Sequence, residues 1–167
     1  VRAIGASNYS AERLRQALAV SKASGLARYE VIQPRYNLHD REDFESGLAE
    51  LAQQEEIGVV SFFSLASGFL SGKYRSLDDA KGKARESFVQ GYFTERGQRV
   101  LKELLAVSEE LSVPPVQTAL AWLLSRPGVT APIASATSVT QLDEVLDAVD
   151  VSIPEPLLAR LTEASRT

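Results

Sequence analysis

The chain has 167 residues, of which 44% are apolar, and its 18 Lys and Arg residues face 22 Asp and Glu residues for a net charge of −4. This apolar content is enough for one buried core and excludes a fully disordered chain, so we expect a single unit over residues 1–167. No apolar run approaches the roughly 18 residues of a membrane-spanning helix, and the basic residues are dispersed. The sequence therefore predicts neither a membrane partner nor a nucleic-acid partner.

Cysteine is absent, and His39 is the only histidine. Disulfides and thiolate metal sites are therefore excluded, a three-ligand zinc site of the familiar kind cannot be built, and we expect no bound metal. The lack of cysteine fits a reducing compartment, and we expect a cytoplasmic protein.

The sequence also contains no Met, and residues 1–6 already have the pattern of a strand. We therefore expect the chain to be a fragment whose upstream part is missing.

The first third of the chain predicts two strands, each followed by a helix. Residues 1–6 form the first apolar run, and residues 10–24 repeat apolar side chains at helical spacing, with Ser10 as the N-cap. Residues 29–33 predict the second strand. Asp40 is expected to cap the helix after it, whose apolar face is made of Phe44, Leu48, Leu51 and Ala52.

Residues 57–63 form the most apolar strand, and apolar character on both faces is typical of a parallel strand that is covered on both sides. The polar segment 71–93 that follows is much longer than the usual connection of a few residues. Long loops after strands of α/β proteins tend to carry function, so we expect a functional loop here. Its charged residues are Lys73, Arg75, Lys81, Lys83 and Arg85 against Asp78, Asp79 and Glu86.

The last third predicts helices on both sides of Pro114 and Pro115 and then a fourth strand over residues 129–135. A capping box, Ser138-x-x-Gln141, begins the next helix, and residues from 154 to 165 form a last one. Strands that alternate with helices predict an α/β fold with a parallel sheet, because each helix supplies the crossover that a parallel neighbour needs.

Polar side chains follow every predicted strand, at the end of a parallel sheet where ligands bind. They are Ser7 and Asn8, Gln33, Ser64 and Ser67, and Ser135, Thr137 and Ser138. Hydroxyls and carboxamides offer donors and acceptors but no proton transfer near neutral pH, so they favour a binding site. The alternative is that Asn8 only caps a helix and Gln33 only pairs with the backbone. His39 is a catalytic base or, more in keeping with its place beside a helix cap, an ordinary polar loop residue.

Five sequence blocks follow one another in a fixed order and spacing. They are IGASNY (4–9), QPRYNL (33–38), SLASGFLSGKY (64–74), ALAWLL (119–124) and ATSVTQL (136–142). Together they closely resemble the C-terminal half of an aldo-keto reductase, and the resemblance covers essentially the whole chain. It implies strands five to eight of a (β/α)8 TIM-type barrel with outer helices, whose partner is the missing N-terminal half of the barrel.

The resemblance also implies a nicotinamide cofactor, NADP with NAD as the alternative, and a small carbonyl substrate. The implied cofactor-binding residues are Ser7, Asn8 and Gln33 at the nicotinamide carboxamide, Phe62 against its ring, Leu65, Ser67 and Lys73 along the pyrophosphate, and Ser135, Thr137, Gln141 and Glu144 around the adenosine. Many members have Arg or Lys where this chain has Thr137 and Gln141, so we expect little discrimination between NADP and NAD. The basic segment 71–93 is expected to fold over the pyrophosphate and to be poorly ordered without it.

The family's catalytic Asp, Tyr, Lys and His belong to the first half of the barrel, and none of their motifs occurs here. No residue is therefore assigned a catalytic role, and we expect an NAD(P)H-dependent oxidoreductase of aldehydes or ketones as the intact protein, with this chain inactive alone. One alternative is a non-catalytic nicotinamide-nucleotide-binding regulatory subunit, as the potassium-channel β subunits of the family illustrate. Another is a half-barrel that pairs with a second copy to cover its two open sheet edges.

Overall fold

The computed structural model describes residues 1–83 and 85–166 of the chain. Four parallel strands form one sheet in the order β1-β2-β3-β4, so strands that follow one another in the sequence also pair in space. They are β1 (Ile4–Ser7), β2 (Tyr29–Gln33), β3 (Gly58–Ser61) and β4 (Val129–Pro132). The prediction of four parallel strands is confirmed. The last two end earlier than expected, since regular pairing stops at Ser61 and Pro132.

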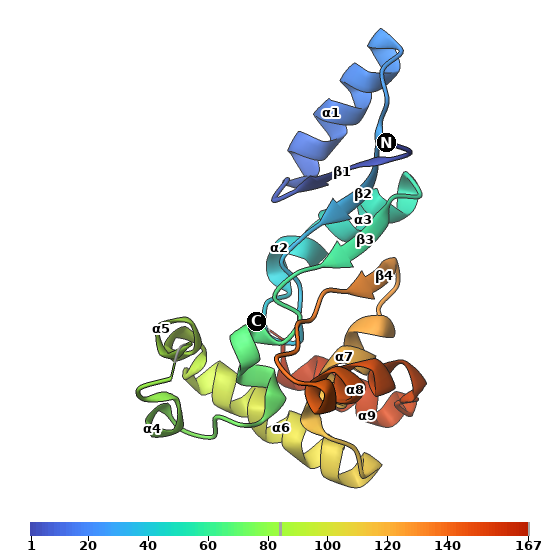
Figure 1. Ribbon diagram of the computed structural model, residues 1–167. Helices are drawn as coiled ribbons and strands as arrows, with labels where there is room; N and C mark the ends of the chain where they lie inside the picture. The colour runs from blue at the N-terminus through green and yellow to red at the C-terminus, as the bar shows by residue number, and fades with distance from the viewer. Residues whose placement is uncertain (84, 167) are drawn as a thin grey trace.

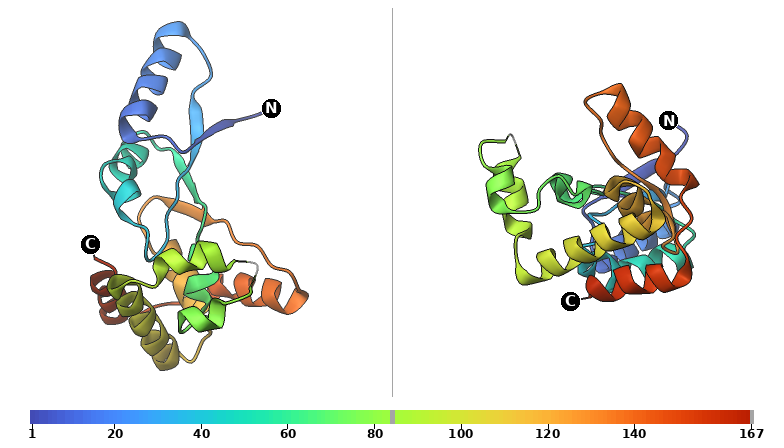
Figure 2. Two further views of the ribbon diagram at one scale, coloured as in Figure 1. Left: turned by 90° about the vertical axis from the view of Figure 1, so that its left-hand side faces the viewer. Right: turned by 90° about the horizontal axis from the view of Figure 1, so that it is seen from below.

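Helices fill every connection between the strands (Figure 1). The regular helices are α1 (Ala11–Ser24), α2 (Glu42–Glu45), α3 (Leu48–Gln54), α4 (Leu77–Ala80), α5 (Glu86–Val89), α6 (Glu95–Leu111), α7 (Pro115–Leu124), α8 (Val139–Leu146) and α9 (Glu155–Ala164), and the 3-10 helices are η1 (Ala66–Ser71), η2 (Gln90–Tyr92) and η3 (Asp147–Asp150). Figure 2 shows α1 and α3 on the same side of the strands β1 to β3. No helix among the described residues has the length and apolar character that crossing a bilayer requires.

The predicted ends of α1 and the predicted start of α7 are confirmed. The Ser10 hydroxyl accepts a hydrogen bond of 3.2 Å from the backbone N–H of Arg13, and Gly25 ends α1 in the left-handed region at a φ of 61°. Pro115 opens α7, a position where its missing N–H costs no helical hydrogen bond.

The prediction that Asp40 caps the second helix is wrong. The N-cap of α2 is Arg41 without a side-chain hydrogen bond, and the expected single helix is two short ones that are interrupted at Gly47, whose φ is 120°. The carboxylate of Asp40 instead accepts side-chain hydrogen bonds from Arg35 and Tyr92. Oδ2 of Asp40 binds these two partners and Oδ1 lies 3.0 Å from His39 Nδ1, so the carboxylate is engaged away from the start of the helix.

The segment 71–93 is not the open loop that its polar sequence predicts. It contains α4, α5 and η2, and the buried apolar or aromatic side chains among its described residues are Tyr74, Ala80, Val89 and Tyr92. These residues anchor the segment to the core. The high content of charged residues in the segment gave no indication of this anchoring. Whether a bound ligand changes its order stays a prediction.

One apolar cluster joins the sheet to the helices, with Trp122 and Tyr36 among its largest buried side chains. In contrast, several large apolar side chains are exposed. They include Ile133, Val139, Leu142, Leu146 and Val149 in the part of the chain that follows β4, and Ile4 in β1, Val20 in α1 and Leu26 just after α1. Among the described residues, β1 and β4 each pair on one side only, so both edges of the sheet are open.

Candidate functional site

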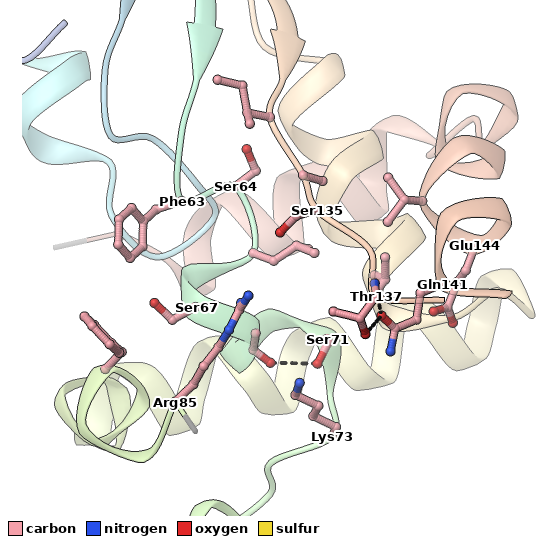
Figure 3. A pocket seen from close by; sticks show the side chains of 17 residues that line it. Phe63, Ser64, Ser67, Ser71, Lys73, Arg85, Ser135, Thr137, Gln141 and Glu144 are labelled. Atoms are coloured by element: carbon pink, nitrogen blue, oxygen red, sulfur yellow. Dashed lines mark hydrogen bonds between the residues drawn. The ribbon is translucent and has the colours of Figure 1, made fainter. Parts of the chain in front are cut away.

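A groove of about 700 Å³ lies beyond the C-terminal ends of β3 and β4 (Figure 3). One wall comes from the connection between β3 and α6, and the other comes from the connection between β4 and α8 and from α8 itself. Val116 of α7 also contributes to the lining. Its polar lining residues are Ser64, Ser67, Ser71, Lys73, Arg85, Ser135, Thr137, Gln141 and Glu144. This position agrees with the prediction that the strand ends build a site.

The first wall depends on an unusual turn after β3. Phe63, Ala66 and Ser67 all have a positive φ, at 57°, 48° and 58°, in the region that L-residues rarely adopt. Gly68 follows at a φ of 95°, where an added Cβ would lie 3.2 Å from Cε of Lys73. The turn therefore lets the Lys73 side chain lie against the backbone, with its Nζ 4.8 Å from the centre of the Tyr74 ring.

The second wall begins at α8, where Ser138 acts as the N-cap, as predicted, by accepting a hydrogen bond from the N–H of Gln141. The predicted capping box is only half formed, because the Gln141 side chain does not return to Ser138. Its Oε1 instead accepts hydrogen bonds from the N–H and the hydroxyl of Thr137, at 3.0 and 2.9 Å. Gln141 and Thr137 are thus held together at one end of the groove, beside Glu144 (Figure 3).

The charge of the groove is positive on the first wall. Lys73 and Arg85 form no ion pair with any carboxylate of the described residues, and in Figure 3 the Arg85 guanidinium points into the groove. Two free cations beside several hydroxyls suit a ligand with phosphate groups. Glu144 is the one carboxylate among the described lining residues, and none of them is Tyr or His. The groove is therefore equipped to bind rather than to transfer protons.

A second polar cluster joins the ends of β1 and β2. The Ser7 hydroxyl lies 3.0 Å from the carbonyl oxygen of Gln33 and 3.2 Å from its side-chain oxygen. The Asn8 carboxamide donates to the Ser7 hydroxyl at 2.9 Å, and Asn8 has a φ of 59°. Asn8 does not cap α1, since Ser10 does.

The structure thus brings ten of the eleven implied residues together in two groups. Seven line the groove, namely Leu65, Ser67, Lys73, Ser135, Thr137, Gln141 and Glu144. Ser7, Asn8 and Gln33 form the cluster at β1 and β2. Phe62 does not line the groove, but its ring contacts that of Phe63, which does, at 5.4 Å between centroids.

Sequence reasoning assigned no role to several residues that line the groove, and the largest of them are Phe63, Arg85 and Phe88. Arg85 and Phe88 lie three residues apart at the short helix α5, so both reach the same side. The only signal for these two was the basic character of the segment 71–93. Their place in the groove follows from the buried anchors of that segment rather than from any motif.

Asp40 is the centre of a third cluster, next to the groove. It accepts hydrogen bonds from Arg35 Nε at 2.9 Å, from the Tyr92 hydroxyl at 2.7 Å and from Asn37 Nδ2 at 3.0 Å, and His39 Nδ1 lies 3.0 Å from its other oxygen. Burial alone raises the pKa of Asp40, but the hydrogen bonds from His39, Tyr92 and Asn37 and the charge of Arg35 outweigh it. Together they hold the pKa of this carboxyl well below its usual range.

The phenols near this cluster are poor acids. Burial, together with the hydrogen bond to Asp40, raises the pKa of Tyr92 to about 12. Burial and a 2.7 Å hydrogen bond to Glu45 also raise the pKa of Tyr36. His39 is buried, packs edge-on against Tyr92 and does not line the groove. The arrangement favours a structural role for His39 over that of a catalytic base.

Residues 1–166 match the aldo/keto reductase family. The chain is 32% identical over 157 residues to a probable voltage-gated potassium channel subunit beta of Arabidopsis thaliana, covering 88% of this chain and 46% of that protein. It is 30% identical over 165 residues to protein tas of Escherichia coli, covering 96% and 47%. An uncharacterized oxidoreductase of Mycobacterium tuberculosis is 34% identical over 167 residues, covering 98% and 49%. The chain thus spans about half the length of each of these relatives.

Proposed function

The chain belongs to the aldo/keto reductase family, and we propose that it is the C-terminal half, strands five to eight, of a (β/α)8 barrel that reduces aldehydes or ketones with NADPH or NADH. Its four parallel strands and the two open edges of the sheet support this assignment. The relatives, each about twice as long, support it as well. The other half of the barrel is then the partner that covers β1 and β4.

The groove carries the proposal for the cofactor, because its donors match a dinucleotide. Lys73 and Arg85, with the hydroxyls of Ser67 and Ser71, would hold the pyrophosphate, and Thr137, Gln141 and Glu144 would surround the adenosine. The cluster of Ser7, Asn8 and Gln33 would hold the nicotinamide carboxamide, beside the ring of Phe62. When bound, the reduced nicotinamide supplies the hydride that a carbonyl carbon accepts.

The described residues supply no evident proton donor for the carbonyl oxygen. No Tyr or His lines the groove, and the phenols of Tyr36 and Tyr92 are hydrogen-bonded to carboxylates. General acid catalysis would then depend on the other half of the barrel. On this proposal the chain alone binds the cofactor without turnover.

A non-catalytic regulatory subunit is the second candidate. It is favoured by the 32% identity to proteins named as probable voltage-gated potassium channel subunits beta, in both Arabidopsis thaliana and Oryza sativa. Such a subunit would use the same groove to sense the nicotinamide nucleotide. The two candidates differ in turnover and agree in cofactor binding.

The test has two steps. In the first, the chain is titrated with NADPH while the nucleotide fluorescence is followed, and we expect saturable binding. In the second, absorbance decay with benzaldehyde is compared for the chain alone and for a protein in which the first half of the barrel precedes it. Turnover by the longer protein alone supports the reductase, and binding without turnover by either supports the regulatory subunit. A folded chain that binds no NADPH contradicts both.

A further inference from the structure

We propose that Arg35 makes the enzyme prefer carbonyl substrates that carry a carboxylate. This inference rests on the proposed function and adds a substrate class to it. Arg35 is not among the residues that the resemblance implies. Its position, its rigid support and its free N–H groups carry the argument.

Arg35 lies on the same face of the sheet as Gln33. Along β2 and the residues after it, Ile32, Pro34 and Tyr36 are buried, whereas Gln33 is half-buried and Arg35 is exposed. This alternation places Gln33 and Arg35 on one side, with Arg35 nearer the C-terminal end of the sheet. If Gln33 holds the nicotinamide carboxamide, Arg35 is one step further toward the mouth, where the substrate enters.

The backbone also places Arg35 next to the candidate for ring stacking. Arg35 forms an isolated parallel bridge with Phe62 beyond the regular ends of β2 and β3. Its guanidinium carbon lies 5.3 Å from the centre of the Phe63 ring, and Phe63 lines the groove (Figure 3). A substrate between the nicotinamide and the mouth would therefore meet this cation.

Two hydrogen bonds and an aromatic face hold the Arg35 side chain in one orientation. Nε donates to Asp40 at 2.9 Å, and Nη2 donates to the Tyr92 hydroxyl at 2.7 Å, while Phe63 packs against the guanidinium. An arginine that is fixed in this way loses little side-chain entropy when it binds an anion.

In the part of the chain that the structure describes, the hydrogen bonds to Asp40 and Tyr92 leave other N–H donors of Arg35 without a partner. Nη1 has no hydrogen-bond partner within residues 1–83 and 85–166, and the side chain is 47% exposed, whereas that of Asp40 is 20% exposed. The Asp40 carboxylate also accepts from Tyr92 and Asn37. The guanidinium is therefore the more exposed part of the pair, and its free N–H groups suit a carboxylate oxygen. Glu42 and Asp43 line the same small pocket, together with Arg41 and Arg96.

The experiment compares two aldehydes that differ by one carboxylate. Binding of 4-carboxybenzaldehyde and of benzaldehyde to the chain saturated with NADP is measured by calorimetry or by NMR, for the wild type, Arg35→Leu and Arg35→Lys. We expect Arg35→Leu to weaken 4-carboxybenzaldehyde about tenfold or more, which corresponds to about 1.4 kcal/mol, and benzaldehyde less than about twofold. Arg35→Lys should restore part of the difference, because it keeps the charge.

The matched control is Arg15→Leu, which removes an exposed arginine from α1 and should leave both aldehydes unaffected. Tyr92→Phe provides a second route, since it keeps the cation but removes one of its supports, and should lower the preference for the carboxylate. Equal losses for both aldehydes in Arg35→Leu, no loss in either, or no binding of 4-carboxybenzaldehyde by the wild type would overturn the inference. The NADPH titration of the wild type reports separately on the proposed function, so the two failures are distinguishable.

Discussion

Tyr92 donates a hydrogen bond of 2.7 Å to Asp40, and this contact ties the end of the segment between β3 and α6 to the loop after β2. The same hydroxyl accepts a hydrogen bond of 2.7 Å from Arg35. The segment that it anchors carries Lys73 and Arg85 into the groove. A structural contact outside the groove thus helps to place the cations inside it.

Tyr92→Phe should destabilise the protein while preserving its packing. The ring stays buried against Phe69, but Asp40 and Arg35 each lose a hydrogen-bond partner. A hydrogen bond to a charged group contributes about 1.5–3 kcal/mol to stability. We therefore expect the free energy of unfolding to fall by about 1–3 kcal/mol in urea titrations. Tyr9→Phe is the control, because it removes a hydroxyl that lies 3.4 Å from that of Tyr29 rather than one that donates to a carboxylate. Equal stability of the two variants would contradict the anchor.

Asp40 should make stability depend on pH in the acidic range. Its folded pKa is lowered, so the stabilisation is complete above the pKa of an unfolded Asp, about 3.9, and is lost as the pH falls from there toward the folded pKa. The difference in unfolding free energy between the wild type and Asp40→Asn should therefore be constant above about pH 5 and shrink below about pH 4. Thermal melts of both proteins above and below this pH range measure the difference. A difference that grows on acidification has the opposite sign and would refute the assignment.

Local patterns in the sequence were sufficient for the order of the strands and for the N-terminal ends of α1, α7 and α8. The caps of α1 and α8 at Ser10 and Ser138 depend on residues three positions apart, which a sequence displays directly. The role of Asp40 depends on Tyr92, 52 residues away, and nothing in the local pattern around Asp40 distinguishes that partner from a helix N–H. Sequence reasoning therefore assigned it a cap.

The groove was predictable only in part for the same reason. Lys73 and Gln141 follow strand ends at recognisable positions, whereas Arg85 reaches the groove through the fold of α4 and α5. The two neighbouring phenylalanines illustrate a further limit. Phe63 adopts a φ of 57°, which directs its side chain into the groove lining, and a conformation that is rare for L-residues has no signature in the sequence.

Lys73→Ala and Arg85→Ala should each weaken NADPH binding by about 1–2 kcal/mol, the scale of one charged hydrogen bond. Both cations lack an ion-pair partner among the described residues, so neither substitution leaves a carboxylate unpaired. The control is Lys102→Ala, at an exposed position of α6. NADPH fluorescence titrations give the three affinities. Unchanged binding in both groove variants would show that the pyrophosphate lies elsewhere.

Discrimination between NADP and NAD should be modest. Thr137 and Gln141 are hydrogen-bonded to each other and carry no charge for a 2′-phosphate. Gln141→Arg should raise the preference for NADP, since it adds a cation at that end of the groove. Parallel titrations with both nucleotides measure the ratio. A wild-type preference beyond about a hundredfold, roughly 2.7 kcal/mol, would mean that another residue, such as Arg85, binds the phosphate.

The open edges of the sheet should make the chain associate when it is expressed alone. Val139 is 75% exposed, Leu146 56% and Val149 69%, and among the described residues the edge strands β1 and β4 each pair on one side only. Such surfaces promote association, and charges placed on them oppose it. Light scattering should therefore give a mass above one chain for the wild type and a lower mass for Leu146→Lys combined with Val149→Lys. A discrete dimer would support pairing of two half-barrels through β1 and β4, whereas larger, heterogeneous species would fit edges made for a different partner. A wild type that stays monomeric at high concentration would contradict the prediction that the open edges cause association.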